Sequence, residues 1–131
     1  MADLKAARRI YELMVLTAWA DGHMHAAEAS AIREIGAAVP DLDGIPDRVE
    51  LSRAIKERID QEGFDGPLRA SAAALTEVAD RELAFRCCAK VLEADGDVEG
   101  EEAEVLATLQ ELFGFTGEDV KRLLARVEQE G

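Results

Sequence analysis

Apolar side chains recur every three to four residues along almost the whole chain, which is the spacing of one face of an α-helix. Residues 3–20 show the pattern first. Further stripes predict helices at about 26–38, from Asp47 to Gly63, from Gly66-Pro67 onward, from Asp80 to Asp95, at about 100–113 and after Thr116. We therefore predict an all-α fold without strands: a single compact bundle of about seven helices, formed by residues 1–131 as one domain.

Short polar motifs predict where these helices begin and end. Asp21-Gly22 and Asp95-Gly96 are expected to stop the helices before them, because glycine readily adopts the left-handed conformation of a helix end. Residues 40–46 contain two prolines and a glycine, which predicts a plain loop. Polar caps are expected at three helix starts: Asp47 with Glu50 in a capping-box spacing, Asp80, and Thr116.

The chain contains an internal repeat that covers residues 11–36 and 85–110. When Ala20-Asp21-Gly22 is placed on Ala94-Asp95-Gly96, Glu28 falls on Glu102 without a gap, and apolar positions of the flanking helices coincide. Each copy then has the order helix, Ala-Asp-Gly turn, helix. Such a repeated unit within one small domain predicts two helix–turn–helix hairpins related by a pseudo-twofold axis.

The repeated pattern resembles the TerB-like family, named after a component of the tellurite-resistance operon and also found as the N-terminal module of a membrane-anchored DnaJ-like co-chaperone. The resemblance rests on residues 19–28 (WADGHMHAAE) and 93–102 (EADGDVEGEE), and as a pattern it extends over nearly the whole chain. It implies a helical bundle in which two acidic hairpins lie close together and bind metal through their carboxylates. The chain departs from the family at His25 and Glu99, where members commonly carry serine or another small capping residue.

The residues themselves leave two interpretations of the acidic hairpins open. In the first, Asp21 and Asp95 mark helix ends, while Glu28 and Glu102 reach back to unsatisfied backbone amides at the start of the next helices. In the second, the four carboxylates converge on a cation, because like charges brought close together need protons or a cation between them. Oxygen ligands alone select a hard ion such as Ca²⁺, Mg²⁺ or Mn²⁺.

Four neighbouring residues are further candidate metal ligands: Asp97, Glu99, His23 and His25. If the two histidines take part, the preference shifts toward Zn²⁺ or Ni²⁺. The alternative is that both are exposed turn residues, one of which caps the second helix. An EF-hand does not fit, because its first ligand position would fall on Val91, which has no side-chain oxygen.

The chain carries 15 Lys and Arg against 28 Asp and Glu, a formal net charge of −13. This charge argues against nucleic acid and anionic membrane surfaces as partners, and it permits cations and basic proteins. No apolar run reaches the roughly 20 residues that span a bilayer, so direct membrane insertion is not expected. The N-terminus does not have the pattern of a signal peptide. The two cysteines, Cys87 and Cys88, are adjacent, which indicates reduced core residues and a cytoplasmic location.

Resemblance and charge together predict a non-enzymatic cytoplasmic module that acts in the tellurite or stress response or in metal-linked signalling. It is expected to bind a divalent metal ion, a protein partner of basic character, or both, through its acidic hairpins. One alternative is an acidic interaction scaffold that docks a basic partner without metal. A more remote alternative is a metal-dependent hydrolase, for which the sequence provides no recognisable general base.

Overall fold

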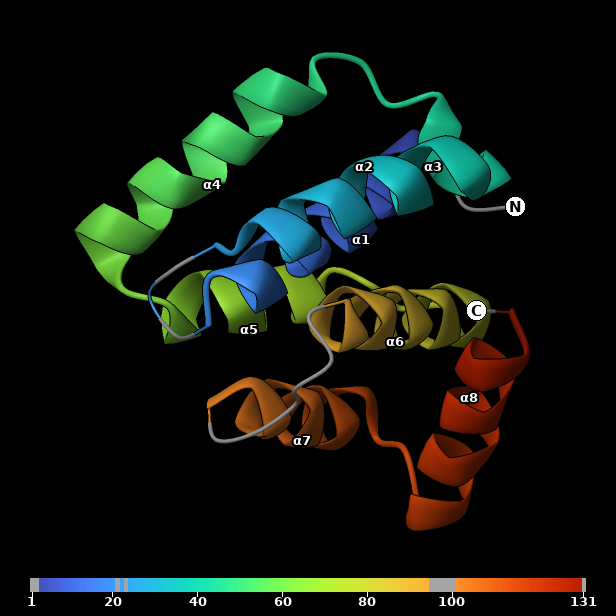
Figure 1. Ribbon diagram of the computed structural model, residues 1–131. Coiled ribbons are helices and arrows are strands. Elements are labelled where there is room, and N and C mark those ends of the chain that lie inside the picture. The colour runs from blue at the N-terminus through green and yellow to red at the C-terminus, as the bar shows by residue number, and fades with distance from the viewer. Residues whose placement is uncertain (1–2, 21, 23, 95–100, 131) are drawn as a thin grey trace.

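The computed structural model describes residues 3–20, 22, 24–94 and 101–130, apart from the side chains of Glu101, Glu102 and Glu130. Within these residues the chain forms helices and no strand, which confirms the all-α prediction (Figure 1). The helices are α1 (Leu4–Ala18), α2 (Ala26–Ala38), α3 (Pro40–Asp43), α4 (Arg48–Glu62), α5 (Asp65–Ala73), α6 (Val78–Glu93), α7 (Glu101–Phe113) and α8 (Gly117–Glu130).

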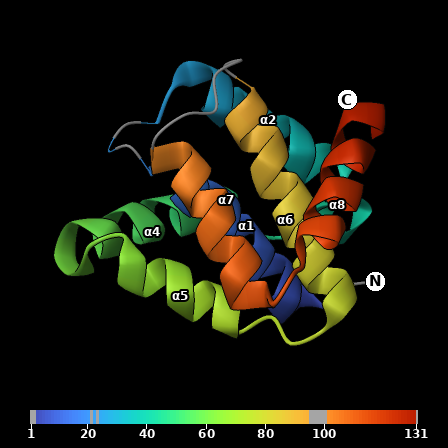
Figure 2. The same cartoon turned by 90° about the horizontal axis from the view of Figure 1, so that it is seen from below.

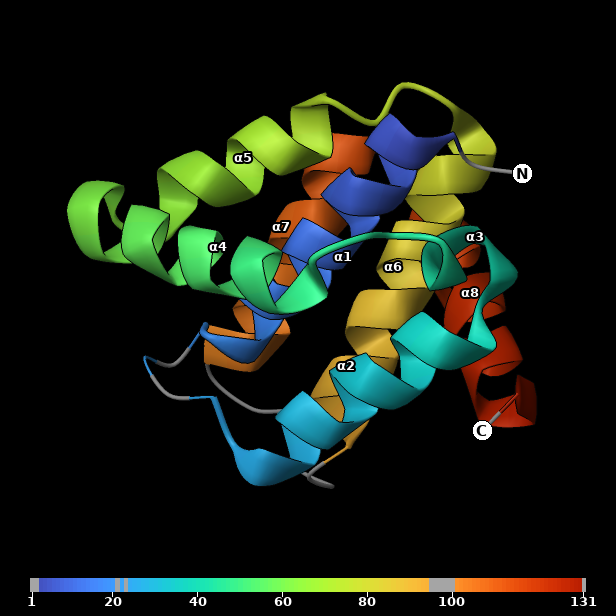
Figure 3. The same cartoon turned by 90° about the horizontal axis from the view of Figure 1, so that it is seen from above.

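Helices α1 and α6 form the centre of the fold and contact each other more extensively than any other pair of described helices. They run in the same direction, so their C-terminal ends lie at one end of the molecule and their N-terminal ends at the other (Figures 2 and 3). The buried core around this pair includes Leu13, Phe85 and Cys88, each at most 1% exposed. The parallel pair therefore sets the direction in which both flanking connections leave the core.

The second half of α1 is buried on all sides of the helix, from Ile10 to Ala18, whereas the sequence pattern predicted a single buried face. The reason is that α2, α3, α4, α5 and α6 all contact α1. A helix surrounded in this way has no solvent-facing side, so apolar residues are buried all round it. Leu13 and Leu16 therefore belong to the core together with Met14 and Val15.

The remaining helices cover the central pair. Helix α2 contacts both α1 and α6, α5 contacts α1 and α7, and α8 packs on α6 (Figure 2). The ring of Phe85 meets the ring of Phe115 edge to face, with centroids 5.7 Å apart, and Phe115 in turn lies against Phe113. These contacts hold the connection between α7 and α8 against α6. None of the helices that the structure describes has both the length and the apolar character needed to cross a membrane.

Helix α4 is shallowly embedded: all its residues are described, and Ile55 alone is buried (Figure 1). Partly buried Leu51 and Ile59 pack against the core beside it. The outer face of α4 carries ion pairs one turn apart, which join Arg53 to Glu50 and Glu57, Lys56 to Asp60, and Arg58 to Glu62. Exposed pairs of this kind contribute only a few tenths of a kcal/mol each, so the apolar face of α4 supplies most of its attachment.

Two predicted features between α2 and α4 are wrong. Residues 40–43 form the single turn of α3 rather than a plain loop, because Pro40 suits the first turn of a helix. Asp47 precedes α4, but its backbone is left-handed with φ of 52°, and its side chain makes no capping hydrogen bond. The side chain of Glu50 instead pairs with Arg53. The predicted capping box is therefore absent at this described helix start.

The other two predicted caps have different outcomes. Thr116 caps α8 as predicted: its hydroxyl oxygen accepts the backbone N–H of Asp119 at 3.1 Å, and the carboxylate of Asp119 accepts the N–H of Thr116 at 2.9 Å. By contrast, α6 begins at Val78 with Glu77 in the cap position, so Asp80 lies inside the first turn and is not the cap. An acidic residue is favourable at either place, which is why the sequence pattern does not distinguish them.

Candidate functional site

The first acidic turn joins α1 to α2. Helix α1 ends at Ala18, three residues before the predicted stop at Asp21-Gly22. Gly22 has φ of 89°, a conformation that glycine adopts without steric penalty. Helix α2 then begins at Ala26, with His25 in the cap position. This connection places Glu28 in the first turn of α2.

Glu28 is the one of the four principal candidate ligands whose side chain the structure describes. It is completely buried, with 0% of its surface exposed. Its Oε1 accepts a hydrogen bond from the backbone N–H of His25 at 3.1 Å, while His25 itself is exposed. A carboxylate in this position also interacts favourably with the positive end of the helix dipole. The capping interpretation is therefore confirmed for Glu28, and the suggestion that one histidine occupies the cap of the second helix is confirmed for His25.

The other candidate ligands lie partly or wholly outside the described residues. Those outside are Asp21, His23, Asp95, Asp97 and Glu99, and Glu102 lies in α7 without a described side chain. Among the side chains that are described, no group of three or more His, Cys, Asp or Glu is arranged to hold a metal ion. The metal site thus stays a prediction, because most of its proposed ligands are not among those side chains.

The described ends of the helices do show how the two connections relate. Because α1 and α6 are parallel, Ala18 and Glu93 both lie at the same end of the molecule (Figure 3). A hollow of about 280 Å³ lies between the residues that follow α1, the start of α5 and α7, where Ala20 and Glu104 line the same space. The residue before the first acidic turn therefore lies near the helix that follows the second one.

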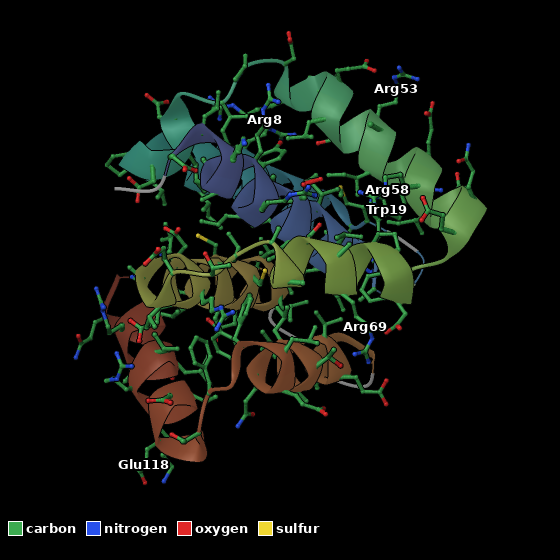
Figure 4. The ribbon with its side chains drawn as sticks, turned by 180° about the vertical axis from the view of Figure 1, so that it is seen from behind. Arg8, Trp19, Arg53, Arg58, Arg69 and Glu118 are labelled. Atoms are coloured by element: carbon green, nitrogen blue, oxygen red, sulfur yellow. The ribbon has the colours of Figure 1, made fainter. Side chains whose placement is uncertain are left out.

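Trp19 connects the first turn to α4. Its ring is partly buried against the core, and the ammonium group of Lys56 lies 4.9 Å from the ring centroid. Figure 4 shows Trp19 on the side of the molecule covered by α4. A cation over an aromatic face contributes about 0.5–1 kcal/mol at a partly exposed site. Trp19 therefore anchors α4 beside the first turn.

The two cysteines are core residues, as the sequence predicted. Cys87 and Cys88 are both buried in α6. Burial raises the pKa of the Cys88 thiol to about 12, and the neighbouring Thr17 offsets only part of this effect. Because the thiolate is the reactive form of cysteine, Cys88 is held unreactive at neutral pH.

Sequence reasoning missed a cleft of about 660 Å³ between α1, α4 and the start of α6. Asp80 lies on its wall, and burial raises the pKa of this carboxyl, an effect to which the nearby charges of Asp3, Glu77 and Asp41 add. The lining residues come from segments far apart in the chain. No local motif indicates such a cleft, because only tertiary packing brings these segments together.

No family model, curated protein or solved structure matches the chain.

Proposed function

We propose that this chain is a non-enzymatic TerB-like module of the cytoplasm that binds a divalent metal ion through two acidic hairpins and thereby engages a protein partner. The hairpins are those of the internal repeat, related by a pseudo-twofold axis. Asp21, Glu28, Asp95 and Glu102 are the proposed ligands, and Asp97, Glu99, His23 and His25 are secondary ones. Four carboxylates suit Ca²⁺, Mg²⁺ or Mn²⁺, and Zn²⁺ or Ni²⁺ becomes the candidate ion if histidine takes part.

The observation that carries this proposal is the parallel packing of α1 and α6. These helices are the first helices of the two repeat copies, and each leads into one Ala-Asp-Gly turn. Parallel helices in contact direct their following turns to the same end of the bundle (Figures 2 and 3). An antiparallel pair would have sent the two acidic turns to opposite ends. The arrangement is therefore the one that a shared cation site requires.

The burial of Glu28 adds support from electrostatics. Removing a carboxylate from water is unfavourable unless nearby groups compensate for the lost hydration. Glu28 is completely buried at the start of α2, in a chain with a net charge of −13. The N–H of His25 and the positive end of the α2 dipole compensate for part of that loss in the metal-free protein, and a divalent cation would add to this stabilisation for Glu28 and the other acidic residues. In the bound state, the ion would supply charge neutralisation, and the chain's carboxylates would fix its position.

A second candidate function is an acidic interaction scaffold that docks a basic partner without metal. The specific observation in its favour is that Glu28 already caps α2 through the N–H of His25. On this account the acidic turns are helix connectors, and their charge attracts a basic protein by long-range electrostatics. Binding to such a partner would weaken steeply with salt and would not change when metal is removed. A metal-dependent hydrolase remains the most remote of the three candidate functions.

Thermal unfolding of the chelator-treated protein in the presence of Ca²⁺, Mg²⁺, Mn²⁺ or Zn²⁺ tests the metal proposal. An ion at about 100 times its Kd stabilises the folded state by about 2.7 kcal/mol, which for a domain of this size raises Tm by roughly 10 °C. The double variant Asp21→Asn, Asp95→Asn should lose this rise. The matched control Glu118→Gln, Glu128→Gln removes the same charge from the exposed face of α8 and should keep it (Figure 4).

Two results would contradict the metal proposal: no ion raises Tm, or the hairpin variant responds to the ion as the unmodified protein does. Salt-sensitive capture of a basic protein by metal-free chain would then favour the scaffold.

A further inference from the structure

The cleft between α1, α4 and the start of α6 is built on the N-terminal ends of α1 and α6, so it lies at the end of the molecule opposite their C-terminal ends. Its volume of about 660 Å³ is in the range of sites that hold small ligands or a few side chains of a bound peptide. The cleft has no residue in common with the proposed metal site, so binding in it would be independent of that site.

The walls of the cleft carry opposite charges. Lys5 and Arg8 line it from α1, beside the ion pair of Arg9 with Glu12, and Figure 4 shows Arg8 on the side of α1 that faces the start of α4. Glu77 and Asp80 line it from the start of α6, and Asp3, which caps α1, adds a third carboxylate near Asp80. Within the part of the chain that the structure describes, no ion pair joins Lys5 or Arg8 to Glu77 or Asp80. Opposite charges that face one cleft without pairing across it leave both available to a ligand.

Between the charged walls the cleft is apolar. Leu51 contributes a partly buried apolar side chain from α4, and Ala6 and Ala74 line the cleft with it. Leu75 also lines the cleft but is only 1% exposed. The cleft thus offers an apolar centre between a basic wall and an acidic wall.

We propose that this cleft binds a short peptide segment of a partner protein, in which apolar residues stand between an acidic and a basic side chain. The acidic side chain would lie toward Lys5 and Arg8, and the basic one toward Glu77 and Asp80. The apolar residues would contact Leu51, Ala6 and Ala74. Charge complementarity on both walls fixes the orientation of the segment, while the apolar contact supplies most of the affinity.

Three capped tetrapeptides with the same Leu-Leu centre test the proposal: Glu-Leu-Leu-Lys, Glu-Leu-Leu-Glu and Lys-Leu-Leu-Lys. Each is titrated into isotope-labelled full-length protein, and the backbone amide signals of Ala6, Leu51 and Ala74 are followed by NMR. We expect the Glu/Lys peptide to shift these signals and to bind about three- to tenfold more tightly than either analogue, because each analogue loses one weak ion pair and gains a like-charge contact.

Charge-reversal variants give the matched controls. Arg8→Glu should transfer the preference to the Lys/Lys peptide, and Glu77→Lys should transfer it to the Glu/Glu peptide. Both side chains are exposed, and Glu77 makes no capping hydrogen bond at the start of α6, so we expect both variants to fold. Arg126→Glu changes the charge by the same amount on the exposed face of α8 and should leave the preference unchanged.

Any of four results overturns the proposal. The first three are that the three peptides bind equally tightly, that no peptide shifts the amide signals of the cleft residues, and that Arg126→Glu changes the peptide preference as much as Arg8→Glu does. The fourth is a shift of the same signals with protein concentration alone, which would make a second copy of this chain the occupant.

Discussion

Replacing Glu28 by alanine should lower the free energy of unfolding of the metal-free protein by about 2–3 kcal/mol. The substitution removes the acceptor for the N–H of His25, which is worth about 1 kcal/mol for a helix cap. It also removes a favourable charge at the helix start, worth about 0.5 kcal/mol. Because Glu28 is completely buried, the lost side-chain atoms leave a cavity that adds about 1 kcal/mol.

Glu28→Gln separates the charge from the hydrogen bond. Glutamine keeps an oxygen for the His25 N–H and almost the same volume, so only the charge at the helix start is lost. We expect a decrease of about 0.5–1 kcal/mol. Glu34→Ala, at an exposed position of the same helix, serves as control and should stay within about 0.5 kcal/mol of the unmodified protein.

Urea unfolding with chelator present measures all three variants. A domain of this length is stable by roughly 7–20 kcal/mol, so each variant remains folded in the absence of urea. The reasoning would be refuted if Glu28→Ala were as stable as the Glu34→Ala control. It would also be refuted if Glu28→Gln were more stable than the unmodified protein, because the buried charge would then be unfavourable to the fold rather than a cap.

Three further predictions concern the backbone, a partly exposed acid and a buried thiol. Asp47→Gly should raise the free energy of unfolding by about 0.5–1 kcal/mol, because glycine adopts the left-handed φ of 52° without steric penalty. If urea unfolding instead gives a lower free energy of unfolding for the variant, Asp47 contributes to α4 as a cap. Asp80→Asn should raise the free energy of unfolding at pH 7, because the raised pKa of Asp80 means that its ionised form is unfavourable in the fold. This gain in stability should disappear as the pH falls toward 3.8, the pKa of an unperturbed Asp. A gain that does not change with pH in urea unfolding would contradict the prediction. A thiol reagent at about pH 8 should label Cys88 only as fast as the protein unfolds, because the thiol is buried with a pKa of about 12; immediate labelling of the native protein would contradict its burial.

Local capping was predictable from the sequence where nearby residues alone determine it. Thr116 and Asp119 satisfy each other's backbone amides three residues apart, and Glu28 does the same for His25. Such bonds depend on helix geometry and not on distant segments, so a sequence pattern identifies them.

Features imposed by tertiary packing were not predictable in this way. Asp47 has the spacing of a cap, but the neighbouring Arg48 donates a hydrogen bond to the backbone oxygen of Asp43 at 3.1 Å and packs over Gly36. A methyl group at Gly36 would meet the guanidinium of Arg48 at 2.8 Å, so the first side chain of α4 reaches across to α2. This contact accompanies the left-handed backbone of Asp47, which the local pattern does not encode.

The candidate site likewise combines features that the sequence predicts with features that tertiary packing determines. The sequence repeat identifies which acidic residues belong to matched turns, but not the direction in which the helices before them pack. The parallel arrangement of α1 and α6 provides that direction (Figure 3). The cleft is assembled from α1, α4 and the start of α6, so it has no counterpart in any one stretch of the sequence.

Isothermal titration calorimetry of chelator-treated protein tests the central claim, that the paired acidic hairpins bind a divalent ion, most directly. Ca²⁺, Mg²⁺, Mn²⁺ and Zn²⁺ are titrated separately into the unmodified protein and into the Asp21→Asn, Asp95→Asn variant. We predict saturable binding of at least one ion to the unmodified protein, with loss of that binding in the variant. Absence of binding for every ion, or equal binding by the variant, would contradict the claim.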